Sequence, residues 1–385
     1  MKRNMVRVLG GATLSLALAA AMTACGTAET AGDKAAGECS GKIGFMGALS
    51  GGNASIVLPS YNAAKLAFEQ FAEDNPDCDV TLQEFDTEGD PSKATPVAAK
   101  IATDQSFLGV IGGAFSGETQ ATKKTFEEAG VTMISQSATS PEITLKDPAK
   151  TFHRVVGHDI IQGAAVAKYL NDVLKAKKVF VVDDGTAYGA PLADEVVKNA
   201  EDIVVSRDKV QEKQTDFAAT ISKIKGAGAD AVYYAGYANE AGPFLKQLRA
   251  AGLDIPFVGS DGLYGVDFPK AAGDQAEGAI ITCPCLPAEE AGGTFAEDYE
   301  AKYGERPGAY AAEGYDAAMI FLEAIKAGNN TREKVEKFVD EYDKDGISKR
   351  LKFDENGDVA RDAVVIWAYR IENGELVPDQ EIKLA

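Results

Sequence analysis

The chain has 385 residues, enough for two or three domains, and 45% of them are hydrophobic while 25% are charged. This balance is typical of large packed cores and argues against intrinsic disorder. The formal net charge is −20 and no stretch forms a basic stripe, which argues against nucleic acid as a partner.

The first 24 residues have the pattern of an export signal. Lys2, Arg3 and Arg7 precede the uncharged apolar stretch VLGGATLSLALAAAM, which is too short to cross a bilayer comfortably. We therefore predict that residues 1–24 are a signal peptide and that the mature protein is exported.

Cys25 directly follows a small residue, Ala24, at the end of this apolar stretch. The sequence MTAC resembles the lipobox of bacterial lipoproteins, in which that cysteine receives the lipid, although Met22 stands where leucine is usual. An ordinary cleaved signal with an incidental cysteine is the alternative. The resemblance implies a lipid-anchored tether at residues 25–40, rich in small and polar residues, which holds the protein on the outer face of the cytoplasmic membrane, at the cell surface or in the periplasm.

Beyond the tether, short β-rich runs alternate with amphipathic helical patterns. This alternation predicts an α/β fold in which mostly parallel sheets are covered by helices on both sides. The alternation of strands and helices starts again near residues 151–159. Nine strand–helix units fit one sheet poorly, so two similar lobes are expected. The predicted strands are residues 42–48, 80–86, 107–114, 131–138, 178–184, 203–210, 231–237, 256–261 and 279–285.

The C-terminal third departs from this alternation. Three helical patterns follow residue 285 without intervening strands, and the chain then ends in KRLKFDENGDVARDAVVIWAYRIENGELV. We predict two or three strands in this last segment, joined by turns at ENGD and ENGE.

Export also makes disulfides permissible, and four cysteines besides Cys25 allow three pairings. Cys39 and Cys78 each directly precede a predicted strand. If these are neighbouring parallel strands, their starts lie side by side, so we predict a Cys39–Cys78 bridge. Cys283 and Cys285 would then bridge locally or stay reduced. A metal there would need further ligands, and the two histidines have no supporting spacing, so we predict no metal.

Polar or small residues follow several predicted strands, at the end where open α/β sheets bind ligands. In GVIGGAFSGETQATKKTF, two glycines end a strand and Ser116 is expected to cap the next helix, with the amides of residues 117–119 facing outward to hold an anion. The other candidates after strands are Ser137, Thr139, Tyr188, Tyr237 and Asp261.

Together these residues suit a zwitterion. Hydroxyls and helix-start amides in the first half would hold a carboxylate, and Asp261 in the second half would hold an ammonium group. Each residue alone is more often a cap, a turn or a packing residue, so only the joint placement favours a site. Enzyme signatures are absent: GGAFSGE is neither a Walker loop nor a nucleophile elbow, and no G-x-G-x-x-G occurs. We predict no enzyme activity, no catalytic residue and no cofactor.

Eight stretches in a fixed order carry a resemblance to a known family: IGFMGALSG, FDTEGDPSKATPVAAKI, GVIGGAFSGETQA, GVTMISQSATSPEIT, AYGAPLADEV, DFAATISKIKGAGADAVYYAGYANEAGPFLKQLRAAG, FVGSDG and DAAMIFLEAI. Across about residues 42–372 the chain resembles the periplasmic-type substrate-binding proteins of branched-chain amino-acid ABC transporters, the Leu/Ile/Val-binding family. The resemblance implies the type I periplasmic-binding-protein fold, with two lobes that are joined by three crossovers and close on a ligand. The implied lobes are residues 41–156 with 284–348, and residues 157–283 with 349–385.

The resemblance also assigns roles to residues. Ser116 and Thr139 match positions that hold the ligand's α-carboxylate, and Ser137 matches a backbone position near its α-amino group. Asp261 occupies the acidic position that pairs with the ammonium, where some members have glutamate. Tyr188 and Tyr237 match tyrosines of the cleft.

Two positions depart from the family pattern, since Ile56 replaces a common aromatic or bulky contact and Gly52 a proline. Both concern recognition of the ligand's side chain rather than of its α-groups.

The implied function is capture of an amino acid, with a branched-chain side chain favoured, and delivery to a permease and an ATPase on separate chains. We expect a monomer that meets the membrane only through its lipid. Two alternatives stay open: a sensing module that presents its ligand to a membrane receptor, and a site for an amide or an aromatic acid instead of an amino acid. The sequence leaves the ligand, its affinity and the permease undetermined.

Overall fold

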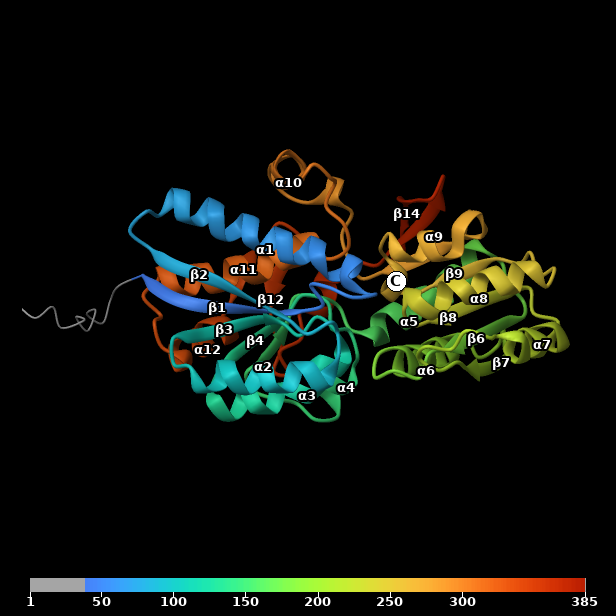
Figure 1. Cartoon of the computed structure of the whole chain (residues 1–385), viewed down its shortest axis with the longest axis horizontal. Coiled ribbons are helices and arrows are strands. Elements are labelled where there is room, and N and C mark those ends of the chain that lie inside the picture. Colours follow the sequence, from blue (N-terminus) through green and yellow to red (C-terminus); the bar gives the residue numbers. More distant parts are fainter. Residues whose placement is uncertain (1–38, 385) are drawn as a thin grey trace, which may run out of the picture. The chain divides into compact units, whose positions relative to one another are not determined.

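The structure is a computed structural model of the chain and describes residues 39–384 (Figure 1). The signal peptide, Cys25 and nearly all of the tether lie outside these residues. Every one of the nine predicted strands overlaps an observed strand, and the α/β prediction is confirmed.

The first sheet has five parallel strands in the order β2-β1-β3-β4-β5. Alternate residues of β1 serve two cores: Ile43 and Phe45 pack under one layer of helices, and Met46 packs under the other. The strands are β1 (Ser40–Gly47), β2 (Asp79–Asp86), β3 (Phe107–Gly112), β4 (Thr132–Ser135) and β5 (Phe152–Arg154).

Two helical layers cover this sheet (Figure 1). One layer holds α1 (Ala54–Asp74), α11 (Ala311–Lys326) and α12 (Arg332–Asp340). The other holds α2 (Pro91–Thr103) and α3 (Ser116–Ala129). We call this sheet with its helices the five-strand lobe. Its shorter elements are α4 (Glu142–Leu145), η4 (Ala288–Glu290), α10 (Phe295–Tyr303), and the small sheet of β11 (Asp343–Asp345) and β12 (Arg350–Lys352).

The second sheet has seven strands in the order β14-β13-β10-β9-β8-β6-β7. All pairings are parallel except those of β13 with β10 and with β14. The predicted ENGE turn joins β13 to β14. The strands are β6 (Val179–Asp183), β7 (Val204–Lys209), β8 (Ala231–Ala235), β9 (Phe257–Gly259), β10 (Ile280–Cys283), β13 (Trp367–Glu372) and β14 (Glu375–Glu381).

Helices again cover both faces, and we call this sheet with its helices the seven-strand lobe. One face carries α5 (Asp159–Lys168) and α6 (Gly189–Asn199). The other carries α7 (Ala218–Ala227), α8 (Ala238–Ala250) and α9 (Asp267–Ala272). The shorter elements are η1 (Tyr169–Val173), η2 (Asp261–Leu263), η3 (Gly273–Ala276) and η5 (Arg361–Ala363).

The chain crosses between the two sheets three times. It leaves β5 for α5, leaves β10 for α10 and α11, and returns to β13 near its end. Before this return, Asp358 bridges to Arg154 of β5, and Phe353 packs edge-on against His153. These contacts put residues 350–359 beside the five-strand lobe, whereas the sequence assigned residues 349–385 to the other lobe. The lobe boundaries stay predictions, and these contacts favour a later third crossing.

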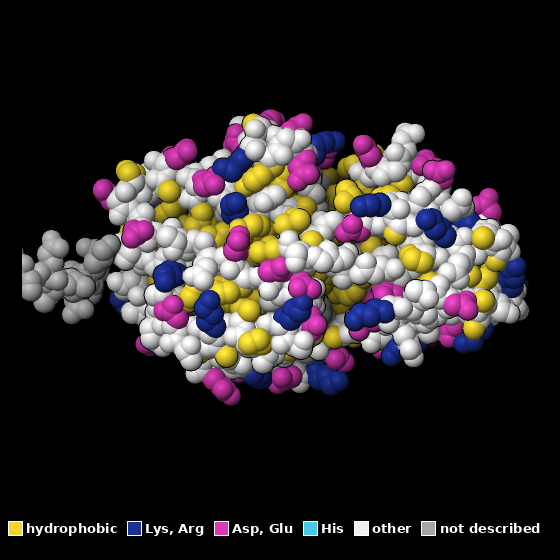
Figure 2. All heavy atoms as spheres, viewed as in Figure 1, with side chains coloured by type: hydrophobic (Ala, Val, Ile, Leu, Met, Phe, Trp, Pro, Cys, Tyr) yellow, Lys and Arg dark blue, Asp and Glu magenta, His cyan; other side chains and the backbone are white. Residues whose placement is uncertain are grey.

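Two disulfides are present. Cys39 is bonded to Cys78, as the neighbouring starts of β1 and β2 suggested, and Cys283 is bonded to Cys285, which the sequence left open. Within residues 39–384, no helix has the length and apolar character needed to span a bilayer. On the face seen in Figure 2, acidic and basic side chains are interspersed.

Candidate ligand-binding site

The strand ends of the two sheets meet at a small hollow. Both lobes contribute to its wall, as parallel sheets do when ligands bind at their carboxyl ends. The residues that line it are Ile56, Val57, Ala114, Phe115, Ser116, Ser137, Tyr188, Tyr237, Asp261 and Tyr310. The structure thus brings together five of the six predicted ligand-binding residues, and Thr139 is not among the lining residues.

The glycine turn after β3 delivers α3 to the hollow. Gly112 has a φ of +117°, and a Cβ there would lie 2.1 Å from the Met46 carbonyl oxygen, so only glycine fits. Ser116 is the first residue of α3 and not its cap: Phe115 holds the cap position, and the Glu118 carboxylate accepts from the Phe115 N–H at 3.1 Å. The expected serine cap is therefore wrong, and Glu118 does that work instead.

Ser116 is buried, and its Oγ accepts a hydrogen bond from the Ser140 N–H at 3.2 Å. Because this bond uses an oxygen lone pair, the Ser116 O–H remains able to donate to an anion. The first N–H groups of an α-helix also lack intrahelical partners, and the helix start carries partial positive charge. This corner of the hollow therefore suits a carboxylate.

Ser137 and Thr139 follow β4. The Ser137 hydroxyl donates to the Ala114 carbonyl at 2.8 Å, so its side chain is already engaged. Thr139 is fully buried, and its hydroxyl makes no hydrogen bond of ordinary geometry to any described residue. It lies beside the hollow, since its carbonyl accepts from the Asp159 N–H at 2.9 Å.

A buried arginine holds the loop that carries these residues. The Arg154 guanidinium donates to the Ala138 and Ser140 carbonyls at 2.9 and 3.0 Å, on either side of Thr139. It also pairs with Asp358 at 2.5 Å, and both side chains are buried. No local sequence pattern indicates this support, because Asp358 lies about two hundred residues away within the ENGD turn.

Asp261 is the centre of the opposite wall. It is 3% exposed and begins η2, directly after β9. Its oxygens accept from the Tyr188 hydroxyl at 2.5 Å, the Tyr310 hydroxyl at 2.6 Å and the Gln162 amide at 2.8 Å. Burial raises the pKa of Asp261, and the hydrogen bonds from these three partners oppose that rise.

A second carboxylate, Asp159, lies close to Asp261. Asp159 is the first residue of α5, is fully buried, and neither of its oxygens has a hydrogen-bond partner among the described residues. Burial raises the pKa of Asp159 well above its usual value, and the Asp261 charge raises it further, while the nearby Thr139 hydroxyl lowers it. Arg154 lies near enough to lower the pKa of Asp159, but neither carboxylate forms an ion pair with a described cationic side chain, so the two together attract a positively charged group.

The sequence reading missed Asp159, Gln162 and Tyr310. A signal existed for Asp159, which starts a helical pattern just after a strand in TFHRVVGHD. Tyr310 precedes α11 in the five-strand lobe and reaches Asp261 only because the two lobes meet. No local pattern indicates that contact.

Aromatic and aliphatic side chains complete the hollow. The Tyr237 ring packs against the rings of Phe115 and Tyr188, with centroids 5.4 and 5.2 Å apart. Ile56 and Val57, at the start of α1, line the same space. This part of the wall offers apolar surface to a ligand side chain.

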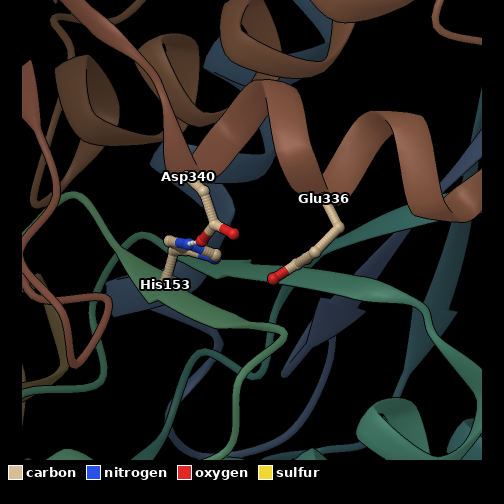
Figure 3. Close-up of side chains that lie close together, drawn as sticks. All are labelled: His153, Glu336 and Asp340. Carbon is tan, nitrogen blue, oxygen red and sulfur yellow. Dashed lines mark hydrogen bonds and ion pairs between the residues drawn. The ribbon is translucent and has the colours of Figure 1, made fainter.

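One further cluster lies away from the hollow, where α12 meets β4 and β5 (Figure 3). His153, Glu336 and Asp340 each place one possible metal ligand within 4.8 Å of the others. The His153 Nε2 lies 3.1 Å from Asp340, and Thr132 donates to Glu336 at 2.7 Å. The buried His153 Nδ1 has no described partner, whereas a metal-bound imidazole usually donates its second N–H to one. The donor set fits a metal poorly and instead ties α12 to the sheet; the expectation of no metal stays a prediction.

The fold and the hollow between two lobes define a binding protein of the periplasmic type. The profile of the periplasmic binding protein family matches residues 40–375, and the chain belongs to this family.

Its relatives include the leucine-, isoleucine-, valine-, threonine- and alanine-binding protein of Pseudomonas aeruginosa, which is 34% identical over 71% of this chain and 74% of that protein. The Leu/Ile/Val-binding protein of Escherichia coli is 31% identical over 83% of this chain and 88% of its own length. Among solved structures, LivJ of Streptococcus pneumoniae in complex with isoleucine has a TM-score of 0.80 at 26% identity, covering 88% of this chain and all of that one.

Proposed function

We propose that this protein is the extracytoplasmic solute-binding component of an ABC importer and that it captures an α-amino acid between its two lobes. The observation that carries this proposal is the buried carboxylate of Asp261, which lines the same hollow as Ser116, with a second buried carboxylate, Asp159, close to it. An ammonium group would relieve the uncompensated charge of the pair. The hydroxyl of Ser116 and the first N–H groups of α3 would hold the carboxylate.

The rest of the ligand would meet the apolar wall. Ile56, Val57, Phe115 and Tyr237 offer aliphatic and aromatic surface and no charge. The relatives named for Leu, Ile and Val support a branched aliphatic side chain for the ligand of this protein as well. Ser137 is assigned to the α-amino end through its backbone, since its hydroxyl is bonded to Ala114.

Capture follows from the division of the site between two lobes. A ligand that contacts Ser116 on one lobe and Asp261 on the other favours the closed arrangement over the open one. A permease can then distinguish the loaded protein by its shape. The permease and the ATPase would be separate chains.

The lipid anchor belongs to this proposal. Cys25 would carry the lipid and hold the protein outside the cytoplasmic membrane, and residues 25–40 would be the tether. The protein would act as a monomer without cofactor and without catalytic activity. Two alternatives remain from the sequence, a sensing module for a membrane receptor and a site for an amide or aromatic acid.

Calorimetric titration of the mature domain, refolded to remove carried-over ligand, tests the ligand class. The panel is the twenty amino acids with small amides and aromatic acids. We expect saturable binding of Leu, Ile or Val and of none of the acids that lack an ammonium group. Binding of an amide or an aromatic acid alone would overturn the amino-acid assignment while leaving the fold in place.

A further inference from the structure

The second crossing between the lobes carries its own disulfide. Cys283 is the last residue of β10 in the seven-strand lobe, and Cys285 follows it by two positions, where the chain leaves for the five-strand lobe. Both side chains are fully buried. The bond therefore closes its small ring inside a segment that must change direction if the lobes move.

The residues around this bond connect it to both lobes. On one side, the Tyr369 hydroxyl of β13 donates to the Cys285 carbonyl at 3.0 Å. On the other, the next residue, Leu286, donates its N–H to the Glu313 carboxylate of α11 at 3.4 Å. Glu313 is in turn paired with Lys349 at 2.9 Å, and both are buried.

Lys349 extends this connection to the first crossing, because its ammonium donates to the Val155 carbonyl at 3.1 Å. The second crossing, which carries Cys283 and Cys285, is thus linked to the first crossing through a series of contacts that runs over Glu313 and Lys349.

A second path leads to the binding site. The Tyr369 ring packs on the ring of Tyr264, with centroids 4.4 Å apart. The Tyr264 N–H donates to the Asp261 carbonyl at 2.8 Å, so Tyr264 closes the turn that presents the Asp261 carboxylate. A conformational change at Cys285 can thus be transmitted to this turn through two contacts, that of Cys285 with Tyr369 and that of Tyr369 with Tyr264.

The two disulfides differ in what they can stabilise. Cys39–Cys78 joins residues 39 positions apart and constrains the unfolded chain over that whole loop. Cys283–Cys285 joins residues two positions apart, and closing so short a loop removes little entropy from the unfolded chain. Its main effect is therefore local, on the shape of the crossing.

We propose that Cys283–Cys285 is a redox-sensitive modification site that sets ligand affinity through the crossing; the affinity part rests on the proposed function. The co-reactant is a dithiol reductant. Its thiolate attacks one cysteine sulfur and forms a mixed disulfide while the S–S bond breaks, and its second thiol then displaces that cysteine. The protein gains two electrons and two protons as Cys283 and Cys285 become thiols, and the reductant leaves as a disulfide.

The reduced crossing has more backbone freedom, which must be lost again when the lobes close on a ligand. We expect reduction to weaken ligand binding about tenfold, the scale of ordering roughly one backbone residue. Linkage requires the converse: ligand disfavours reduction by the same factor. Since both sulfurs are fully buried in the structure, the thiolate reaches them only when the crossing opens locally.

The test uses the whole mature domain and dithiothreitol as the dithiol. Alkylation and peptide mass mapping measure which cysteines are reduced, with and without the tightest-binding amino acid. Calorimetry then compares affinities of oxidised and reduced protein for the wild type, Cys283→Ala/Cys285→Ala and the matched control Cys39→Ala/Cys78→Ala. We expect an affinity loss in the wild type and in the control, and no response to reductant in Cys283→Ala/Cys285→Ala.

Hydrogen exchange of the Leu286 amide, without ligand, provides a readout that does not depend on the proposed function. We expect faster exchange after reduction, in wild type as in the control. Unchanged exchange at Leu286 would overturn the redox site, whichever ligand the protein binds. Equal affinities of oxidised and reduced wild type would overturn its effect on binding, and absence of any ligand for the oxidised protein would overturn the proposed function instead.

Discussion

The two walls of the hollow differ in charge. The residues of the five-strand lobe that line the hollow have no charged side chain. Behind them, the Ser116 hydroxyl accepts from the Ser140 N–H, and Arg154 pairs with Asp358 and donates to two loop carbonyls. The seven-strand lobe places Asp261 in the wall and a second buried carboxylate, Asp159, close to it. Asp261 accepts from three donors, whereas Asp159 has no hydrogen bond of ordinary geometry among the described residues. The five-strand wall therefore needs no counter-charge, whereas no described cationic side chain pairs with the carboxylates of the seven-strand lobe. Under the proposed function, this difference would set the polarity of the ligand and its orientation.

The largest effect is expected from replacing Arg154, which holds the loop of the five-strand wall. Arg154→Met leaves Asp358 buried without its partner, and breaking a buried ion pair costs about 3–5 kcal/mol. We expect the free energy of unfolding, measured in urea, to fall by that amount. Arg350→Met is the control, since the Arg350–Asp343 pair is exposed and should contribute little to stability. Equal losses in both variants would contradict the role given to Arg154.

Removing the carboxylate from the seven-strand wall should weaken ligand binding. Asp261→Ala removes the carboxylate that would face the ligand ammonium, and we expect affinity for an amino acid to weaken by about 2 kcal/mol or more, roughly thirtyfold. Asp261→Asn removes the charge but keeps the shape of the side chain, and it should weaken binding too. Asp274→Asn, at an exposed position on the same lobe, should leave calorimetric affinity unchanged. Wild-type affinity in Asp261→Ala would remove this residue from the site.

The charged wall also predicts a pH dependence. The folded-state pKa values of Asp159 and Asp261 are raised, so each carboxyl holds its proton to higher pH than in the unfolded chain. A ligand ammonium favours the ionised pair and displaces protons on binding. Affinity should therefore fall as pH decreases from 8 to 5, by at most about tenfold per pH unit for one displaced proton.

Calorimetry in buffers of different ionisation enthalpy would measure this proton release directly. Asp159→Asn should release fewer protons. Uptake of protons by the wild type on binding would contradict the sign of the proposed linkage.

The smallest effect is expected from a substitution in the five-strand wall. Ser116→Ala removes one donor to the ligand carboxylate, and a single hydrogen bond of this kind contributes about 1 kcal/mol net, or roughly fivefold in affinity. Ser137→Ala is the matched control, because that hydroxyl already donates to the Ala114 carbonyl. We expect the control to bind within twofold of the wild type, roughly 0.4 kcal/mol. A larger loss in Ser137→Ala than in Ser116→Ala would reverse the assignment of the two serines.

The sequence by itself determined the α/β class, the strands, and five residues that line the hollow. These follow from local rules: apolar periodicity marks the strands, and polar residues just after strands mark the end of a sheet that binds ligands. Local rules also placed Cys39 and Cys78 at neighbouring strand starts, and the structure has that bond. The serine cap was wrong because Ser116 is already the first residue of the helix and Phe115 holds the cap position, with its N–H donating to Glu118.

Only the tertiary structure decided which distant residues complete the site. Tyr310 reaches Asp261 from the other lobe, and Asp358 reaches Arg154 from a turn far along the chain. Asp159 gains its significance from burial beside Asp261, which no spacing along the sequence records. The physical reason is that desolvation and charge interactions depend on three-dimensional distance, whereas a sequence pattern reports only what neighbours along the chain can do.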